Sequence, residues 1–110
     1  MYSIFKGLMN FKIAILALVF ALSTPAWANM DLAKKNTCMA CHNVDKKLVG
    51  PSYQDVAKKY AGQKDAAANL AISIKAGGSG KWGVVPMPPQ AALSDTDATT
   101  LATWILSGAK

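Results

Sequence analysis

Both cysteines of the chain and its single histidine lie in one pentapeptide, Cys38-Met39-Ala40-Cys41-His42. On a helical turn, residues three apart share a face, so the two thiols can bond to the same edge of a planar ligand. Cys-x-x-Cys-His is typical of covalent haem attachment, in which the cysteines form thioethers and the histidine turns toward the iron. The motif therefore predicts one covalently bound haem c, with Cys38 and Cys41 as its attachment points and His42 as an axial ligand of the iron.

Two other kinds of site use the same residue types. A structural zinc site needs four protein ligands, and this cluster offers three, so a carboxylate would have to complete it. A thioredoxin-like redox pair belongs to a fold of alternating strands and helices, and the chain has no such alternation. Haem attachment fits the pattern better than either alternative.

The second axial ligand would decide the chemistry, because a closed iron site favours electron transfer and an open one favours small-ligand binding or peroxidase chemistry. The chain has no second histidine, which leaves methionine as the soft ligand. Met39 lies between the cysteines and cannot cross the haem that they hold, and three other methionines lie in the first 30 residues. Met87 lies 45 residues after His42, between prolines that stiffen the backbone. We expect Met87 to bind the iron; the alternative is a buried residue that fills a gap.

Trp82 has one indole N–H donor and a large apolar face. Beside the haem it could donate to a propionate and make that charge less costly to bury. As an ordinary core residue it would need no such role. We expect it to combine the two roles, and we expect Tyr53 and Tyr60 to be core residues.

The first 28 residues resemble a secretory signal peptide. Two lysines precede the apolar run Ile13 to Leu22, whose ten residues are too few to span a membrane comfortably. Ala26-Trp27-Ala28 has the small-x-small pattern of a cleavage site. We expect cleavage after Ala28, with residues 29–110 forming a single periplasmic domain that is not inserted in the membrane; an uncleaved N-terminal anchor is the alternative.

Charge and size narrow the possible functions of this domain. Residues 29–110 contain ten lysines and six aspartates, a formal charge of +4, and the chain has no arginine. Export argues against a nucleic-acid partner, so the basic surface indicates either plain solvation or attraction to an acidic protein. A domain of this size buries too little surface to be very stable alone. We therefore expect the haem to complete the core and the chain without it to be largely unfolded.

Hydrophobic spacing and capping residues predict an all-α fold. Ser52 and Ser94 each begin a Ser-x-x-Asp capping motif, and Asp65 is expected to cap a further helix. The residues expected to face inward recur at helical spacing. The predicted helices span 31–40, 53–60, 66–76 and 95–107, and residues 77–93 form a long irregular segment.

Four stretches of the chain resemble the small bacterial class I cytochromes c called cytochrome c-551 or c-552. They are Cys38 to His42, Val49 to Tyr53, Trp82 to Pro89 and Leu101 to Leu106. The resemblance covers nearly all of residues 29–110. It implies four or five short helices wrapped around one covalently bound haem c.

The resemblance also implies roles for individual residues. His42 and Met87 would be the axial ligands, the Pro51 carbonyl would accept from the His42 ring, Trp82 would bond a propionate, and Gln90 would approach the Met87 sulfur. Two positions depart from relatives: Ala33 stands where many carry Phe, and Ser73 where some carry Arg near the propionates. Propionate hydrogen bonding is therefore expected to be sparser, and the crossing of the first and last helices is expected to depend more on Trp104 and Leu101.

Together these features predict a monomeric one-electron carrier, not an enzyme, whose iron cycles between Fe(II) and Fe(III). The resemblance implies a cytochrome bc-type donor and a terminal oxidase, nitrite reductase or peroxidase as acceptor. Lys46, Lys47 and Lys81 could steer docking. The resemblance also implies that the exposed haem edge is surrounded by Met39, Ala40, Leu48, Val49, Val84, Val85, Pro86 and Pro88. A haem enzyme or gas sensor, a zinc module and a subunit of a larger oxidase or reductase are the alternatives.

Overall fold

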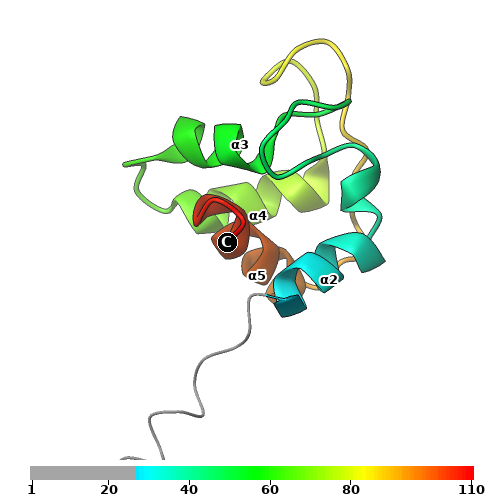
Figure 1. Cartoon of the computed structure of the whole chain (residues 1–110), viewed down its shortest axis with the longest axis vertical. Coiled ribbons are helices and arrows are strands. Elements are labelled where there is room, and N and C mark those ends of the chain that lie inside the picture. The colour runs from blue at the N-terminus through cyan, green and yellow to red at the C-terminus, as the bar shows by residue number, and fades with distance from the viewer. Residues whose placement is uncertain (1–26) are drawn as a thin grey trace, which may run out of the picture.

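The computed structural model describes residues 27–110, and this part of the chain contains four α-helices and one short 3-10 turn (Figure 1). They are α2 (Trp27–Lys35), the 3-10 turn η2 (Cys38–Ala40), α3 (Tyr53–Tyr60), α4 (Ala66–Ala76) and α5 (Asp95–Leu106). The predicted all-α class is confirmed for these residues. The expected signal peptide falls almost entirely on residues 1–26, which lie outside the described residues.

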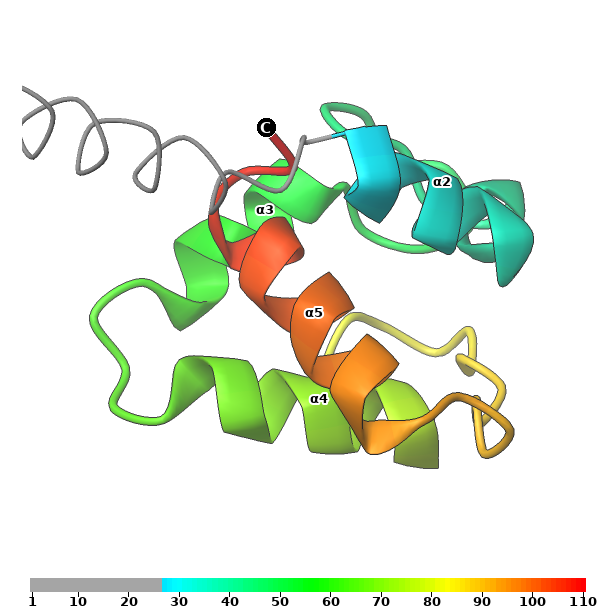
Figure 2. The same cartoon turned by 90° about the horizontal axis from the view of Figure 1, so that it is seen from below.

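Helix α5 is the centre of the packing, because it contacts α2, α3 and α4 (Figure 2). Its Ser94 hydroxyl accepts from the Asp97 N–H, as the capping motif predicts. Its buried residues, Ala98, Leu101, Ala102, Trp104 and Ile105, recur at the helical spacing that the sequence predicts. The alanines among these residues and Ala33 of α2 are fully buried, and such small side chains let helices approach closely.

Helices α3 and α4 have the bounds that the sequence predicts. Ser52 caps α3 by accepting from the Asp55 N–H. The expectation that Asp65 caps α4 with its side chain is wrong: its backbone is left-handed (φ 58°) and its carboxylate accepts no capping hydrogen bond. A capping side chain needs the extended backbone that Ser52 has.

The first predicted helix, 31–40, is also wrong in its bounds. Helix α2 begins at Trp27, so the expected cleavage point after Ala28 falls in its first turn, and it ends at Lys35. Thr37 then adopts a left-handed backbone (φ 60°), which a regular α-helix cannot include. This break separates α2 from η2 and lets the cysteine segment turn away from the helix axis.

Residues 77–93 are irregular, as expected, apart from one isolated antiparallel bridge between Gly78 and Met87. The Gly78 N–H donates to the Met87 carbonyl at 3.0 Å, and the Met87 N–H donates to the Gly78 carbonyl at 2.8 Å. The bridge closes residues 79–86 into a loop and holds the backbone of Met87 beside the end of α4.

None of the helices described here is both long enough and apolar enough to cross a membrane.

Candidate functional site

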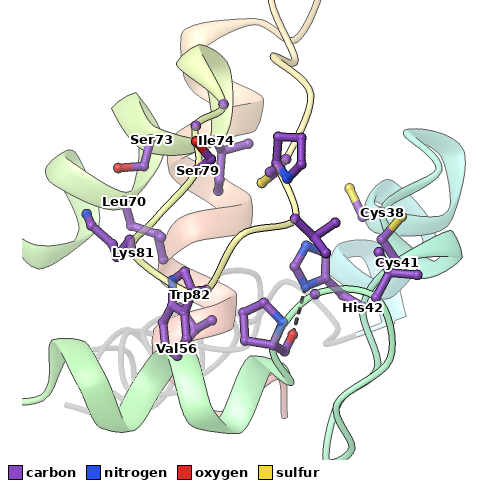
Figure 3. A pocket seen from close by; sticks show the side chains of 18 of the residues that line it. Cys38, Cys41, His42, Val56, Leu70, Ser73, Ile74, Ser79, Lys81 and Trp82 are labelled. Carbon is purple, nitrogen blue, oxygen red and sulfur yellow. Dashed lines mark hydrogen bonds between the residues drawn. The ribbon is translucent and has the colours of Figure 1, made fainter.

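A cavity of about 340 Å³ lies between the Cys38–His42 segment, α3, α4, α5 and the loop that the Gly78–Met87 bridge closes (Figure 3). Most of its wall is apolar. Six of the seven predicted site residues line it: Cys38, Cys41, His42, Pro51, Trp82 and Met87. The folded chain therefore brings together residues that are up to 49 positions apart in sequence.

Both predicted attachment residues are free, partly buried thiols. The turn η2 places them: the Cys41 N–H and the His42 N–H both donate to the Cys38 carbonyl, at 3.2 and 3.0 Å. Burial raises the pKa of the Cys38 thiol, so the residue is predominantly protonated at neutral pH. The two sulfurs lie on the same side of the cavity (Figure 3).

The orientation of the His42 ring is set by the loop that follows it. Its Nδ1 lies 2.7 Å from the Pro51 carbonyl oxygen. A carbonyl can only accept, so Nδ1 carries the proton and Nε2 keeps a free lone pair. Tyr53 stacks on the ring with centroids 5.5 Å apart and planes 19° apart. The imidazole is thus held in the tautomer that can bind a metal through Nε2.

Gly50 is a supporting residue to which the sequence interpretation gave no role of its own. A β-carbon at this position would lie 2.5 Å from Cε1 and 2.9 Å from Nδ1 of His42. Only glycine leaves room for the imidazole here. The sequence signal was its place directly before Pro51, which accepts from the same ring.

Met87 is partly buried and packs against the hydrophobic core. Gly77 supports it in the way that Gly50 supports His42, because a β-carbon on Gly77 would lie 2.5 Å from the Met87 carbonyl oxygen. Gly77 also has φ +64°, which disfavours any other residue. The Met87 segment therefore lies against the end of α4 with no side chain between them.

Trp82 lies on the wall of the cavity and is 38% exposed. Its ring is covered by the Lys59 ammonium, which lies 4.2 Å from the ring centroid. The neighbouring Lys81 donates to the Tyr60 hydroxyl at 3.0 Å. Sequence reasoning gave Lys81 only a part in steering docking and gave Lys59 no role, because their contacts depend on how the loop folds back on α3.

Gln90 is the one predicted site residue that does not line the cavity. Its side-chain amide donates to the Pro88 carbonyl at 3.3 Å, and its backbone N–H donates to the Lys75 carbonyl at 3.1 Å. In this arrangement Gln90 braces the backbone after Met87. Ser73, at the position where some relatives carry Arg, lines the cavity.

Residues 27–110 contain no group of three or more His, Cys, Asp and Glu side chains close enough to hold a metal ion. A four-ligand zinc site built on the cysteine motif would therefore need ligands that this arrangement does not bring near it. The free thiols, one available imidazole nitrogen and a methionine around an apolar space suit a flat apolar cofactor better.

Comparison with known proteins agrees with this geometry. The family model described as "Cytochrome c" matches residues 30–109. Cytochrome c-552 of Hydrogenobacter thermophilus is 57% identical over 93 residues, which cover 84% of this chain and 94% of that protein. Cytochrome c-551 of Pseudomonas aeruginosa is 50% identical over 97 residues, which cover 86% of this chain and 92% of that protein.

A solved structure of a cytochrome c also matches this chain. The crystal structure of wild-type Nitrosomonas europaea cytochrome c552 matches with a TM-score of 0.69 at 58% identity. The match covers 71% of this chain and 96% of that one.

Proposed function

Because this chain belongs to the cytochrome c family, whose members are small electron carriers with one covalently attached haem c, we propose that it is a periplasmic one-electron carrier with His42 and Met87 as axial ligands. The observation that carries the proposal is that both residues line one apolar cavity, whose wall also holds the two free thiols. Both axial positions are then filled by the protein.

The residues present fit the haem. The wall of the cavity is built largely from core side chains of α3, α4 and α5, such as Leu70, Ile74 and Leu101. The two thiols share one side of it (Figure 3), as attachment to a single haem edge requires. A soft sulfur ligand and a neutral imidazole form the donor set of low-spin, electron-transferring haem iron.

The haem supplies an iron centre that takes up and releases one electron at a time. In this proposal the chain keeps His42 and Met87 in fixed positions during electron transfer. Pro51 and Tyr53 orient the His42 ring, and Gly50 leaves the space for it. The Gly78–Met87 bridge fixes the methionine backbone. Little has to rearrange on electron transfer, and so the barrier to it stays low.

Electrons would enter and leave where cavity-lining residues reach the surface. Val49, Val85, Pro86 and Pro88 both line the cavity and are exposed. Next to them in sequence, Val84 is 93% exposed and Leu48 is 49% exposed. Exposed apolar residues gathered in this way are typical of an interaction surface.

Lys46 and Lys47 are exposed in the loop before Gly50 and supply positive charge beside this surface. We propose that acidic redox proteins dock here, with a cytochrome bc-type donor and a terminal oxidase, nitrite reductase or peroxidase as acceptor. Redox encounters use small interfaces, below about 1,200 Å², so binding is expected to be weak and sensitive to salt.

Location in the periplasm follows from the proposed cleavage of residues 1–28 and would leave 29–110 as the functional domain.

The test is the weak near-infrared charge-transfer band that sulfur ligation gives to oxidised haem. The wild-type protein should have it, and Met87→Leu, which conserves volume, should lose it and gain the ability to bind carbon monoxide when reduced. Met39→Leu is the matched control and should keep the band. A wild-type protein without the band, or one that binds carbon monoxide readily, would instead indicate an open iron site and the sensor or enzyme alternative.

A further inference from the structure

The cavity has two chemically different ends. The thiols of Cys38 and Cys41 lie at one end, and Ser73, Lys81 and Trp82 lie at the other, with His42 between (Figure 3). In a haem, the pyrrole rings that carry the carboxylates lie across the macrocycle from those that carry the vinyl groups. Attachment of the vinyl edge to the cysteines would therefore direct the carboxylates toward the polar end.

Lys81 is the cation at this polar end. Its ammonium donates to the Tyr60 hydroxyl at 3.0 Å and lies 5.5 Å from the centroid of the same ring. Tyr60 is buried, at 6% exposure, so its hydroxyl is a fixed point on α3. An ammonium has three donors, and this contact uses one of them.

Lys59 holds the same segment from the other side. Its ammonium donates to the Lys81 carbonyl at 2.7 Å and covers the Trp82 ring at 4.2 Å. The last turn of α3 therefore fixes both the backbone of Lys81 and the indole beside it. The loop is irregular in itself, and these two lysines attach it to a helix.

Neither ammonium has an acidic partner within the part of the chain that the structure describes. The salt bridge found there joins Lys75 to Asp95, and no carboxylate comes within 4.0 Å of Lys59 or Lys81. The chain also has no arginine. Lys81 thus lines one end of the apolar cavity, Lys59 holds its backbone there, and neither ammonium is neutralised by a carboxylate of the described residues.

We propose that Lys81 pairs with a haem carboxylate at this end of the cavity, and that Tyr60 and Lys59 position it there. The inference rests on the proposed function. It makes Lys81 a positioning residue that binds the cofactor, in addition to any part it has in steering partners. Ser73 has a short neutral side chain, so the positive charge at this end of the cavity comes from Lys81 on the loop.

The test uses the haem-loaded protein and follows the titration of the carboxylate, through the pH dependence of the midpoint potential and of the haem methyl proton signals. The titratable or charged groups facing this end are Lys81 on the loop and Tyr60 and Lys59 on α3; α4 contributes Ser73, which does not titrate. Lys81→Gln should lower the acid dissociation constant of the carboxylate about tenfold, since a cation at this range favours the ionised form. It should also lower the midpoint potential at neutral pH.

Two control variants distinguish a specific pair between Lys81 and the haem carboxylate from an effect of the protein's net charge. Lys81→Arg should keep the wild-type titration, and Lys64→Gln, which removes an exposed lysine between α3 and α4, should leave it unchanged. Tyr60→Phe should shift it in the direction of Lys81→Gln but less. A Lys81→Gln curve that matches wild type or Lys64→Gln overturns the inference. Absorption spectra recorded first distinguish this from failure of the proposed function, which would appear as missing haem or missing Met87 ligation in the wild type.

Discussion

The imidazole of His42 lies against Gly50 so closely that a β-carbon at residue 50 would stand 2.5 Å from Cε1 of the ring. Gly77 has the same relation to the carbonyl oxygen of Met87. Each proposed iron ligand thus lies against its own glycine, Gly50 shortly after His42 and Gly77 shortly before Met87. Because neither glycine has a side chain, the His42 ring and the Met87 backbone can occupy these positions.

Gly50→Ala should destabilise the protein by about 1–3 kcal/mol, the usual cost of forcing an extra carbon into a packed site. The imidazole must move, so its hydrogen bond to the Pro51 carbonyl should weaken. Thermal unfolding followed by circular dichroism measures the first effect, and the NMR signals of the His42 ring in the haem-loaded protein report the second.

Gly62→Ala is the control for Gly50→Ala. Gly62 has φ +74°, and a β-carbon there would meet no atom within 4 Å, so alanine costs backbone strain of about 1 kcal/mol without a steric contact. It should lower stability and leave the ring signals unchanged. Unchanged ring signals in Gly50→Ala as well would contradict the role given to Gly50.

Thr37→Asn should stabilise the protein by about 0.5–1 kcal/mol, because asparagine tolerates the left-handed backbone better than a β-branched residue. Thr37 has φ 60° and is exposed, so little packing changes. Chemical denaturation of the two haem-loaded proteins measures the difference. Thr100→Asn, at an exposed helical position of α5, should bring no gain; an equal gain there would mean that backbone strain at Thr37 is not the cause.

The ion pair between Lys75 of α4 and Asp95 of α5 should give stability a dependence on acid pH. The hydrogen bond and charge of the lysine hold the pKa of Asp95 below its ordinary value. A lowered folded pKa means that the contribution is complete above the unfolded pKa, about 3.9, and is lost as pH falls through the folded value. Lys75→Gln should therefore flatten the fall in melting temperature below about pH 4. Lys64→Gln should leave that slope as it is; a slope that Lys75→Gln does not change would show that the pair contributes nothing.

Removal of the haem should unfold most of the chain. An empty cavity of about 340 Å³ would cost on the order of 8 kcal/mol at about 24 cal/mol per Å³, an upper figure because the cavity opens to solvent. That is similar to the whole stability of a small domain, ~5–15 kcal/mol. The double variant Cys38→Ala/Cys41→Ala, purified without haem, should show low helical content and no cooperative melting. A cooperative melt of the haem-free chain would contradict this expectation.

Local signals were enough to predict much of the fold. The bounds of α3 and α4 follow from capping residues and apolar spacing, which act within one helix. The bounds of α2 could not be predicted, because nothing in the side chain of Thr37 indicates a left-handed backbone. Asp65 failed as a cap for a related reason: a suitable side chain does not cap when its own backbone is left-handed instead of extended.

The candidate site, like the fold, could be predicted from the sequence only in part. The motif around His42 and the prolines around Met87 are visible in sequence, and the structure places both residues on one cavity. The contacts of Lys59 and Lys81 join α3 to a loop more than 20 residues later, and that of Gly50 depends on how the loop after His42 folds back on the ring; residue type alone reveals none of them. The approach of Gln90 to the Met87 sulfur stays a prediction; its amide donates to the Pro88 carbonyl, a contact that residue type alone does not indicate.

The contacts of α5 also determine when the core of the protein can form. This helix contacts α2, α3 and α4, and it follows all three of them in the chain. In an exported chain, α2, α3 and α4 cannot pack on α5 until α5 has also crossed the membrane, so Cys38 and Cys41, which cross earlier, stay accessible on an open chain. The same topology that would later enclose the haem thus leaves an interval in which both thiols are open to reaction with it.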